Sequence, residues 1–255
     1  MKSLLVSGLA VLLAGLALAG TPGWAGDRMA KVIPKDAQVG VVNLLSAEVM
    51  HYHVAEDSNN SFWKIRTVKW PVDNMLAEAL KEPAEKLGLT LTPLAPTDAL
   101  KHARESCFVN AALADGLPKR CWAPLTDQAT SGSVNYLIIM APGLNDTNHA
   151  GSSRIESVSE TMRGWGFLTR ERAGAKDKPT LFNEVELLLI NVTPQGVALK
   201  ARQWGGLYGA HWQSYTLPAD PKAIPDEQLD ELQPIFASML ARQAKDLLDQ
   251  VHSAP

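Results

Sequence analysis

The stretch VNYLIIMAPGLNDTNHAGSSR, at residues 134–154, decides the fold of this chain. Residues 134–141 form its most apolar run outside the N-terminal segment, and no polar alternation follows Asn135 in that run. Such a pattern is typical of a strand that is buried on both faces of a sheet. Pro142 and Gly143 then turn the chain away from the sheet. We therefore expect a central strand over 134–141.

Polar side chains crowd the loop that follows this strand. They are Asn145, Asp146, His149, Ser152 and Arg154. Open α/β sheets bind ligands beyond the carboxyl ends of central strands. We therefore predict that these side chains bind a polar ligand or a partner protein, without a catalytic nucleophile. The alternative is an ordinary surface loop made of turn residues.

A hydrolase is a second interpretation of the 142–154 loop. Asp146 and His149 have the Asp-x-x-His spacing that resembles the acid and base of SGNH-type esterases. The resemblance implies an ester hydrolase. The rest of that pattern is missing, because the chain has neither a Gly-Asp-Ser near its N-terminus nor a Gly-x-Ser-x-Gly nucleophile elbow.

Three strands are predicted before the first helix, over residues 39–45, 48–54 and 62–70. In the third, Trp63 and Ile65 alternate with Lys64 and Arg66. Alternation of this kind is typical of a strand with one face in water. The three runs follow one another closely, so we expect an antiparallel meander.

Helical spacing of apolar residues predicts helices over 71–87, 97–114 and 235–251. Thr97 is a suitable N-cap for the second helix. Pro83 lies inside the first and is expected to kink it or end it early. Two apolar runs over 181–192 and 197–204 flank the turn sequence TPQG, which predicts a hairpin. The fold class is thus α+β or three-layer α/β, a mixed sheet with antiparallel hairpins and about three helices.

His51 and His53 are the weak candidates for a metal site. Positions two apart in a strand share one face, so both imidazoles are able to reach one ion. Glu48, Asp57 or a residue distant in the sequence would have to complete the site. We expect two histidines on the solvent face of a strand, with a periplasmic metal-binding protein as the alternative.

The N-terminus and the cysteines both point to export. Residues 1–25 combine a positive start, an apolar run and small residues at Gly23 and Ala25, which is typical of a cleaved signal peptide. An uncleaved membrane anchor is the alternative; no transmembrane segment is expected after cleavage. Cys107 and Cys121 are the only cysteines, so one disulfide is predicted, with two buried thiols as the alternative. The expected location is the periplasm or the medium, with one domain over 26–255.

Composition excludes several classes of partner. Lys and Arg number 24 against 27 Asp and Glu, so there is no basic excess for nucleic acid. Hydrophobic residues make up 46% of the chain, which is typical of a globular protein. No dinucleotide or phosphate-binding glycine motif is present, and we expect no cofactor.

The layout resembles the CsgG-like and TolB amino-terminal-like domains of exported bacterial envelope systems. The resemblance rests on VGVVNLL at residues 39–45, on the helix over 75–87 and on GLTL at residues 88–91. The long insertion between the first strand and the helix departs from that pattern. The resemblance implies a non-catalytic domain that acts through partners. We therefore predict an exported, non-enzymatic envelope protein that binds a partner protein or a small polar ligand.

Overall fold

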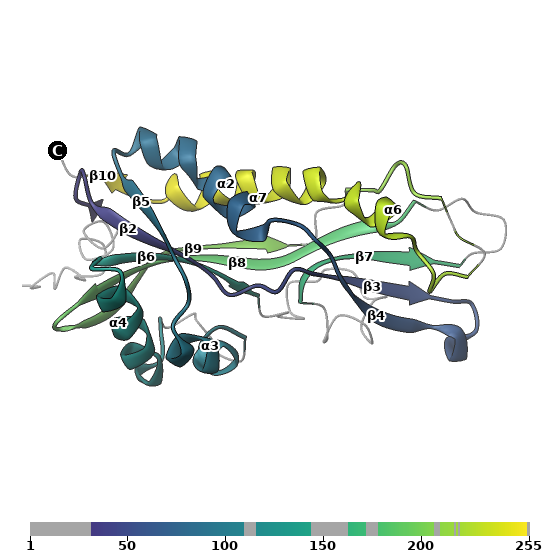
Figure 1. Ribbon diagram of the computed structural model, residues 1–255, viewed down its shortest axis with the longest axis horizontal. Helices are drawn as coiled ribbons and strands as arrows, with labels where there is room; N and C mark the ends of the chain where they lie inside the picture. The colour runs from purple at the N-terminus through teal and green to yellow at the C-terminus, as the bar shows by residue number, and fades with distance from the viewer. Residues whose placement is uncertain are drawn as a thin grey trace, which may run out of the picture. The chain divides into compact units, whose positions relative to one another are not determined.

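A computed structural model describes residues 32–109, 116–143, 163–171, 178–206, 210–216, 218 and 220–253. It confirms the predicted class, a mixed sheet with helices (Figure 1). The strands are β1 (Val32–Ile33), β2 (Gln38–Asn43), β3 (Glu48–Val54), β4 (Phe62–Thr67), β5 (Thr90–Leu94), β6 (Tyr136–Pro142), β7 (Gly164–Arg170), β8 (Thr180–Thr193), β9 (Gly196–Gly206) and β10 (His252–Ser253). The α-helices are α2 (Val72–Lys86), α3 (Asp98–Arg104), α4 (Trp122–Ser131), α6 (Asp226–Asp230) and α7 (Gln233–Leu248).

The long strand β8 organises the main sheet, whose order is β4-β3-β7-β8-β6-β2-β5, with β9 on the other edge of β8. β7 pairs with β8 over Thr180–Glu184, and β6 pairs with it from Val185 onward. The strands β6 and β7 therefore lie end to end along one edge of β8. The first half-sheet contains β5, β2, β6 and β9, and the second contains β4, β3 and β7. We call the level at Glu184 and Val185, where the two meet, the junction.

Hydrophobic cores lie on both faces of the first half-sheet. One core packs Val41, Met140 and Leu187 against α2 and α7. The alternate residues, such as Ile139 and Leu188, pack on the opposite face with α3, α4 and the π-helical turn η2 (Glu105–Val109). Figure 1 shows the two pairs of helices on opposite sides of the sheet. The predicted central strand is confirmed, since six of the seven residues of β6 are buried.

Local signals fixed several element boundaries as predicted. The side chain of Thr97 accepts a hydrogen bond from the Leu100 N–H, which caps α3. The chain leaves α2 at Gly88, whose φ of 69° favours glycine. The hairpin of β8 and β9 closes between Thr193 and Gly196. Pro83 does not end the helix early, because α2 continues to Lys86. A proline so close to the C-terminal end of a helix disturbs little of it.

The predicted opening meander is wrong. Only β3 and β4 form an antiparallel pair, whereas β2 pairs in parallel with β5 and β6 in the first half-sheet. The connection over residues 44–47 carries the chain across the junction, so consecutive strands join different half-sheets. Short local spacing predicted a hairpin there, but long-range pairing along β6 and β8 decided the order.

The second predicted helix is also different from the structure. α3 ends at Arg104 and the π-helical turn η2 replaces its continuation; residues 110–115 lie outside the described part of the chain. α4 was not predicted. It follows Cys121, which lies in a short 3-10 turn and pairs at disulfide distance with Cys107, with Cα atoms 5.7 Å apart. The pair holds η2 against the start of α4. This arrangement agrees with the predicted disulfide.

Within the described residues, no helix has the length and hydropathy needed to span a membrane.

Candidate functional site

A cavity of about 200 Å³ opens at the junction. The connection between β2 and β3, the facing ends of β6 and β7, and the end of α3 all contribute to it. We call it the junction cavity. Its lining residues are Leu45, Ser46, Glu48, Met50, Ile65, Arg104, Glu105, Pro142, Arg163, Gly164 and Trp165.

Two arginines and a glutamate form an ion-pair chain beside this cavity. The Nη2 of Arg104 lies 3.0 Å from Oε1 of Glu105, and the Nη1 of Arg163 lies 3.2 Å from its Oε2. Arg104 also donates to the carbonyl of Leu44 at 3.4 Å. Because both oxygens of Glu105 are engaged, its single negative charge faces two guanidinium groups. This side of the cavity therefore carries positive charge, while Glu48 adds a carboxylate elsewhere in the lining.

Two buried carboxyl groups lie in β8 at the same level. Glu184 and Glu186 are 1% and 0% exposed. Glu184 and Glu186 alternate along β8 with residues that face α7. Both side chains therefore point to the opposite face of the sheet, on which Met50, Ile65 and η2 line the cavity. Glu184 also pairs in register with Gly164, which is part of the lining.

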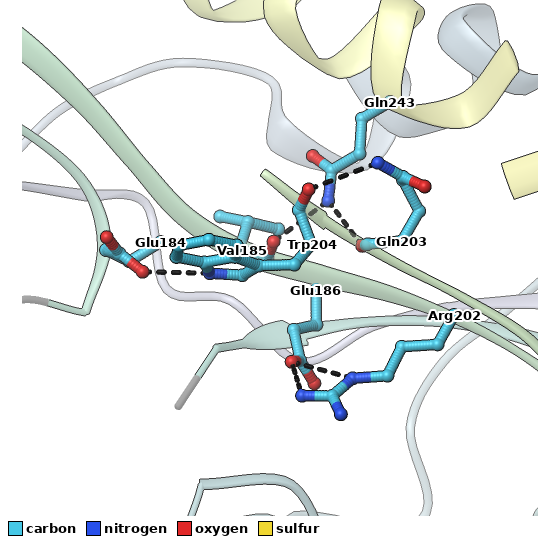
Figure 2. A network of polar contacts seen from close by, with 7 residues as sticks. All are labelled: Glu184, Val185, Glu186, Arg202, Gln203, Trp204 and Gln243. Carbon is cyan, nitrogen blue, oxygen red and sulfur yellow. Dashed lines mark hydrogen bonds and ion pairs between the residues drawn. The ribbon is translucent and has the colours of Figure 1, made fainter. Parts of the chain in front are cut away.

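Different neighbours satisfy the two carboxyl groups (Figure 2). The indole Nε1 of Trp204 donates to Oε2 of Glu184 at 2.9 Å. Arg202 donates to Oε1 of Glu186 through both Nε and Nη2, the former at 3.0 Å. The second oxygen of Glu186, Oε2, is buried and has no hydrogen-bond partner among the described residues. The pair thus contains one ion-paired and one indole-bound carboxyl group.

Burial raises the pKa of Glu184 to about 7, with a smaller contribution from the nearby Glu186 and an opposing one from the Trp204 hydrogen bond. Burial also raises the pKa of Glu186, but the hydrogen bonds and charge of Arg202 oppose that rise. Burial thus favours the protonated form of both carboxyl groups, and the ion pair with Arg202 opposes this at Glu186.

A β-bulge shapes the strand at this point. The register of β8 and β9 shifts between Asn183 and Glu186. The side-chain amide of Gln243 in α7 donates to the carbonyls of Val185, within the bulge, and Gln203, both at 2.8 Å (Figure 2). Gly205 lies opposite the bulge, where a Cβ atom would approach the carbonyl oxygen of Asn183 to 2.4 Å. Contacts from α7 therefore hold the backbone of β8 beside Glu184 and Glu186 in place.

The predicted binding residues Asn145, Asp146, His149, Ser152 and Arg154 lie outside the described residues. The same holds for the Asp-x-x-His pair of the hydrolase interpretation, which stays untested. The described ends of this segment both reach the junction. Pro142 and Arg163 line the cavity, and the N–H of Gly143 donates to the carbonyl of Glu184 at 2.8 Å. The buried strand before this segment ends at Pro142, and the loop itself stays a prediction.

The expectation that His51 and His53 face solvent is wrong, because they are 1% and 5% exposed. His51 stacks on Phe167 and His53 on Phe62. The Thr169 hydroxyl donates to the Tyr52 carbonyl, so both rings must donate to it, His51 through Nε2 at 2.8 Å and His53 through Nδ1 at 2.9 Å.

Burial lowers the pKa of His51 to about 3, and His53, Arg66 and Lys64 lower it further. Burial also lowers the pKa of His53, while Glu171 opposes that shift. Both rings are therefore neutral and hydrogen-bonded at pH 7, as in a packed core. Nowhere in the described chain do three or more His, Cys, Asp or Glu residues come together as a metal site.

The sequence interpretation missed Glu184 and Glu186. It assigned 181–192 to a hairpin strand and did not single out these two acids. The available signal was their spacing, since two acids at positions i and i+2 share one face of a strand that is otherwise apolar. The sequence did not reveal which partners they would have, because Arg202 and Trp204 meet them only through the bulged pairing with β9.

Comparisons with known proteins give no family for this chain. No family model matches it, and no curated protein does. Among solved structures, it is similar to the hypothetical protein CT253 from Chlamydia trachomatis, with 10% sequence identity, 82% of this chain and 98% of that chain covered, and a TM-score of 0.30.

Proposed function

We propose that this protein is an exported, non-enzymatic binding protein of the cell envelope, which holds a small polar ligand in the junction cavity. The observation that carries the proposal is the charged lining of that cavity, which contains Arg104, Glu105 and Arg163. The cavity lies where the facing ends of the two half-sheets meet. Strand ends hold side chains more rigidly than a free loop does, so less entropy is lost on binding.

Size and charge define the class of ligand. A volume of about 200 Å³ is below the roughly 300–1,000 Å³ that is common for drug-sized ligands. Guanidinium groups and carboxylates lie in the same lining. A molecule the size of an amino acid, with one anionic and one cationic group, would satisfy both kinds of charge.

The segment between Pro142 and Arg163 supports the same assignment. It starts and ends at cavity-lining residues. Its polar residues, above all Asn145, Asp146, His149 and Arg154, are of the type that bind polar ligands. We propose that they add to the cavity as a binding surface rather than as a catalytic centre.

Thermal unfolding with simple probes tests this function. The probes are free amino acids, with succinate as an anion that has no cationic group and putrescine as a cation that has no anionic group. Ligand at 100 times its Kd stabilises a folded protein by about 2.7 kcal/mol, which raises Tm by roughly 5–10 °C in a domain of this size. We expect a zwitterionic probe to give such a rise, and Arg163→Gln to abolish it.

Arg170→Gln is the matched control, because Arg170 is exposed at the far end of β7. It should leave the rise in Tm intact. If no zwitterionic probe raises Tm, or if both variants reduce the rise equally, the cavity is not the binding site. Replacing Asp146 and His149 with Ala tests the loop, and ester hydrolysis that disappears in Ser152→Ala would contradict a non-enzymatic role.

Export is tested separately by mass spectrometry of the protein isolated from its cells. We expect a mature N-terminus near Gly26 because of the small residues that end the apolar run. A mature protein that retains residues 1–25 would contradict cleavage.

A further inference from the structure

Strand β4 forms one edge of the main sheet. It pairs with β3 alone, in antiparallel register from Glu48 opposite Thr67 to His53 opposite Phe62. Every second residue of an edge strand directs its N–H and C=O away from its neighbour. Among the described residues, no backbone hydrogen bond from another segment reaches this outer side. Within the described part of the chain, the outer side of β4 is therefore open to a further strand.

One face of this edge strand is apolar and exposed. Trp63 is 59% exposed and Ile65 is 45% exposed. The sequence had predicted that only one face of this strand is in contact with water. Their cross-strand neighbours Tyr52 and Met50 belong to a small apolar cluster with Leu168 and Phe182. The apolar surface thus continues from β3 onto the open edge, where water contacts it. Contiguous exposed apolar surface of this kind marks an interaction site.

The other face of β4 carries positive charge. Lys64 donates to the carbonyl of Lys222, and Lys222 lies with its Nζ 5.2 Å from the ring centroid of Phe62. Arg66 forms a 3.0 Å ion pair with Asp226. Three basic groups therefore lie beside Asp226, and Glu171 acts on the neighbouring His53. Basic side chains outnumber acidic ones here, so a partner that lies along the edge meets a net positive face.

The charge pattern argues against a second copy of this chain as the occupant. Two β4 strands that pair about a two-fold axis place Lys64 and Arg66 of one copy across from the same residues of the other. Like charges directly opposite each other destabilise a strand pair, and lysine on an edge strand is a common device against self-association.

We propose that β4 binds an extended segment of a partner protein as an added antiparallel or parallel strand. In that segment, apolar residues alternate with Asp or Glu. The apolar residues pack on Trp63 and Ile65, and the carboxylates face Lys64 and Arg66. Backbone hydrogen bonds supply affinity, and alternate side chains supply specificity, as in other strand-addition complexes. This interface shares Ile65 with the lining of the junction cavity, whereas Trp63 and Lys64 lie outside that lining.

Two synthetic peptides test the proposal directly. Both are acetylated, amidated octapeptides that alternate Val or Ile with a charged residue, which is Glu in one and Lys in the other. Binding to the full chain is measured from the fluorescence of tryptophan and from backbone amide shifts. We expect the Glu peptide to bind at least tenfold more tightly than the Lys peptide, with the largest amide shifts in β4.

Two exposed substitutions locate the interface without disturbing the core. Trp63→Thr keeps a residue that favours strands and removes the apolar contact, so affinity for the Glu peptide should fall about tenfold or more. Lys64→Glu should reverse the preference between the peptides. Val32→Thr is the control, because Val32 is an exposed apolar residue in β1, outside this sheet. Trp63 does not line the junction cavity, so the zwitterion test should be unaffected.

Three outcomes would overturn the proposal. They are equal affinity for both peptides, unchanged affinity in Trp63→Thr, and no binding of the Glu peptide at millimolar concentration. A dimer in sedimentation experiments that dissociates in Trp63→Thr would assign the edge to a second copy instead.

Discussion

At the scale of single residues, the burial of Glu184 makes the stability of the protein depend on pH. Its pKa is raised to about 7 in the folded protein from an ordinary value of 4.5. The folded state therefore binds more protons than the unfolded chain between these values, and the free energy of unfolding falls as pH rises from 4.5 through 7.

Glu184→Gln removes this titration while the amide oxygen still accepts from Trp204. We expect the variant to match the wild type near pH 4.5 and to exceed its free energy of unfolding at pH 8 by about 1–3 kcal/mol. Urea unfolding at the two pH values measures the difference. The exposed Glu227→Gln is the control. An equal effect at both pH values would contradict a raised pKa.

His51 has the opposite effect on stability. Its pKa is about 3 when folded and 6.5 ordinarily, so the unfolded chain binds the extra proton between these values. Stability is then lost as pH falls below 6.5, by at most about 1.4 kcal/mol per pH unit from this group.

In His51→Gln, we expect a lower free energy of unfolding at pH 7, because the aromatic stacking is lost, and a shallower decline toward pH 4. Chemical unfolding across this pH range tests both expectations. His102→Gln, at an exposed position of α3, should retain the wild-type decline. A decline as steep in His51→Gln as in the wild type would show that His51 does not drive it.

At the scale of elements, α7 is tied to the bulge of β8 through Gln243. This side chain is fully buried, donates to the carbonyls of Val185 and Gln203, and accepts from Asn183 at 3.2 Å. Hydrogen bonds from this one side chain thereby connect the helix to both β8 and β9. The amphipathic pattern of α7 was predicted from the sequence, but this polar contact was not, because it depends on the register of two strands.

Gln243→Leu keeps the approximate size of the side chain and removes its hydrogen bonds to the carbonyls of the buried Val185 and the half-buried Gln203. Each such group costs about 1–3 kcal/mol, so we expect a loss of roughly 3 kcal/mol in the free energy of unfolding. Gln213→Leu, at an exposed position, should change it by less than about 0.5 kcal/mol. A loss of similar size in both variants would mean that the buried amide is not important.

At the scale of the whole described fold, β8 belongs to both half-sheets. It pairs with β7 over its first residues and with β6 over the rest. Neither half-sheet is complete without it, so we expect them to unfold together.

Hydrogen exchange of backbone amides tests this cooperativity. Slowly exchanging amides of β3 and β7 should report the same opening free energy as those of β2 and β6, to within about 1 kcal/mol. Leu188→Ala, in the shared strand, should lower both values together. If exchange in the second half-sheet is faster and insensitive to that variant, the halves are separate units.

Elements whose signals are local were predicted correctly from the sequence. Apolar runs fixed β6, β8 and β9, helical spacing fixed α2 and α7, and Thr97 fixed the start of α3. Each depends on residues within a few positions, where propensity and capping act. The binding residues predicted over 145–154 lie outside the described chain and stay predictions.

The tertiary structure alone decided the order of the strands and the burial of polar groups. His51 and His53 were predicted to face solvent and Glu184 and Glu186 were not singled out, yet all four are buried. Trp63 is apolar, yet it is exposed, because β4 is the edge strand. Whether a strand lies at the centre or at the edge depends on pairings between segments more than a hundred residues apart, such as β3 with β7, and a local pattern contains no information on them.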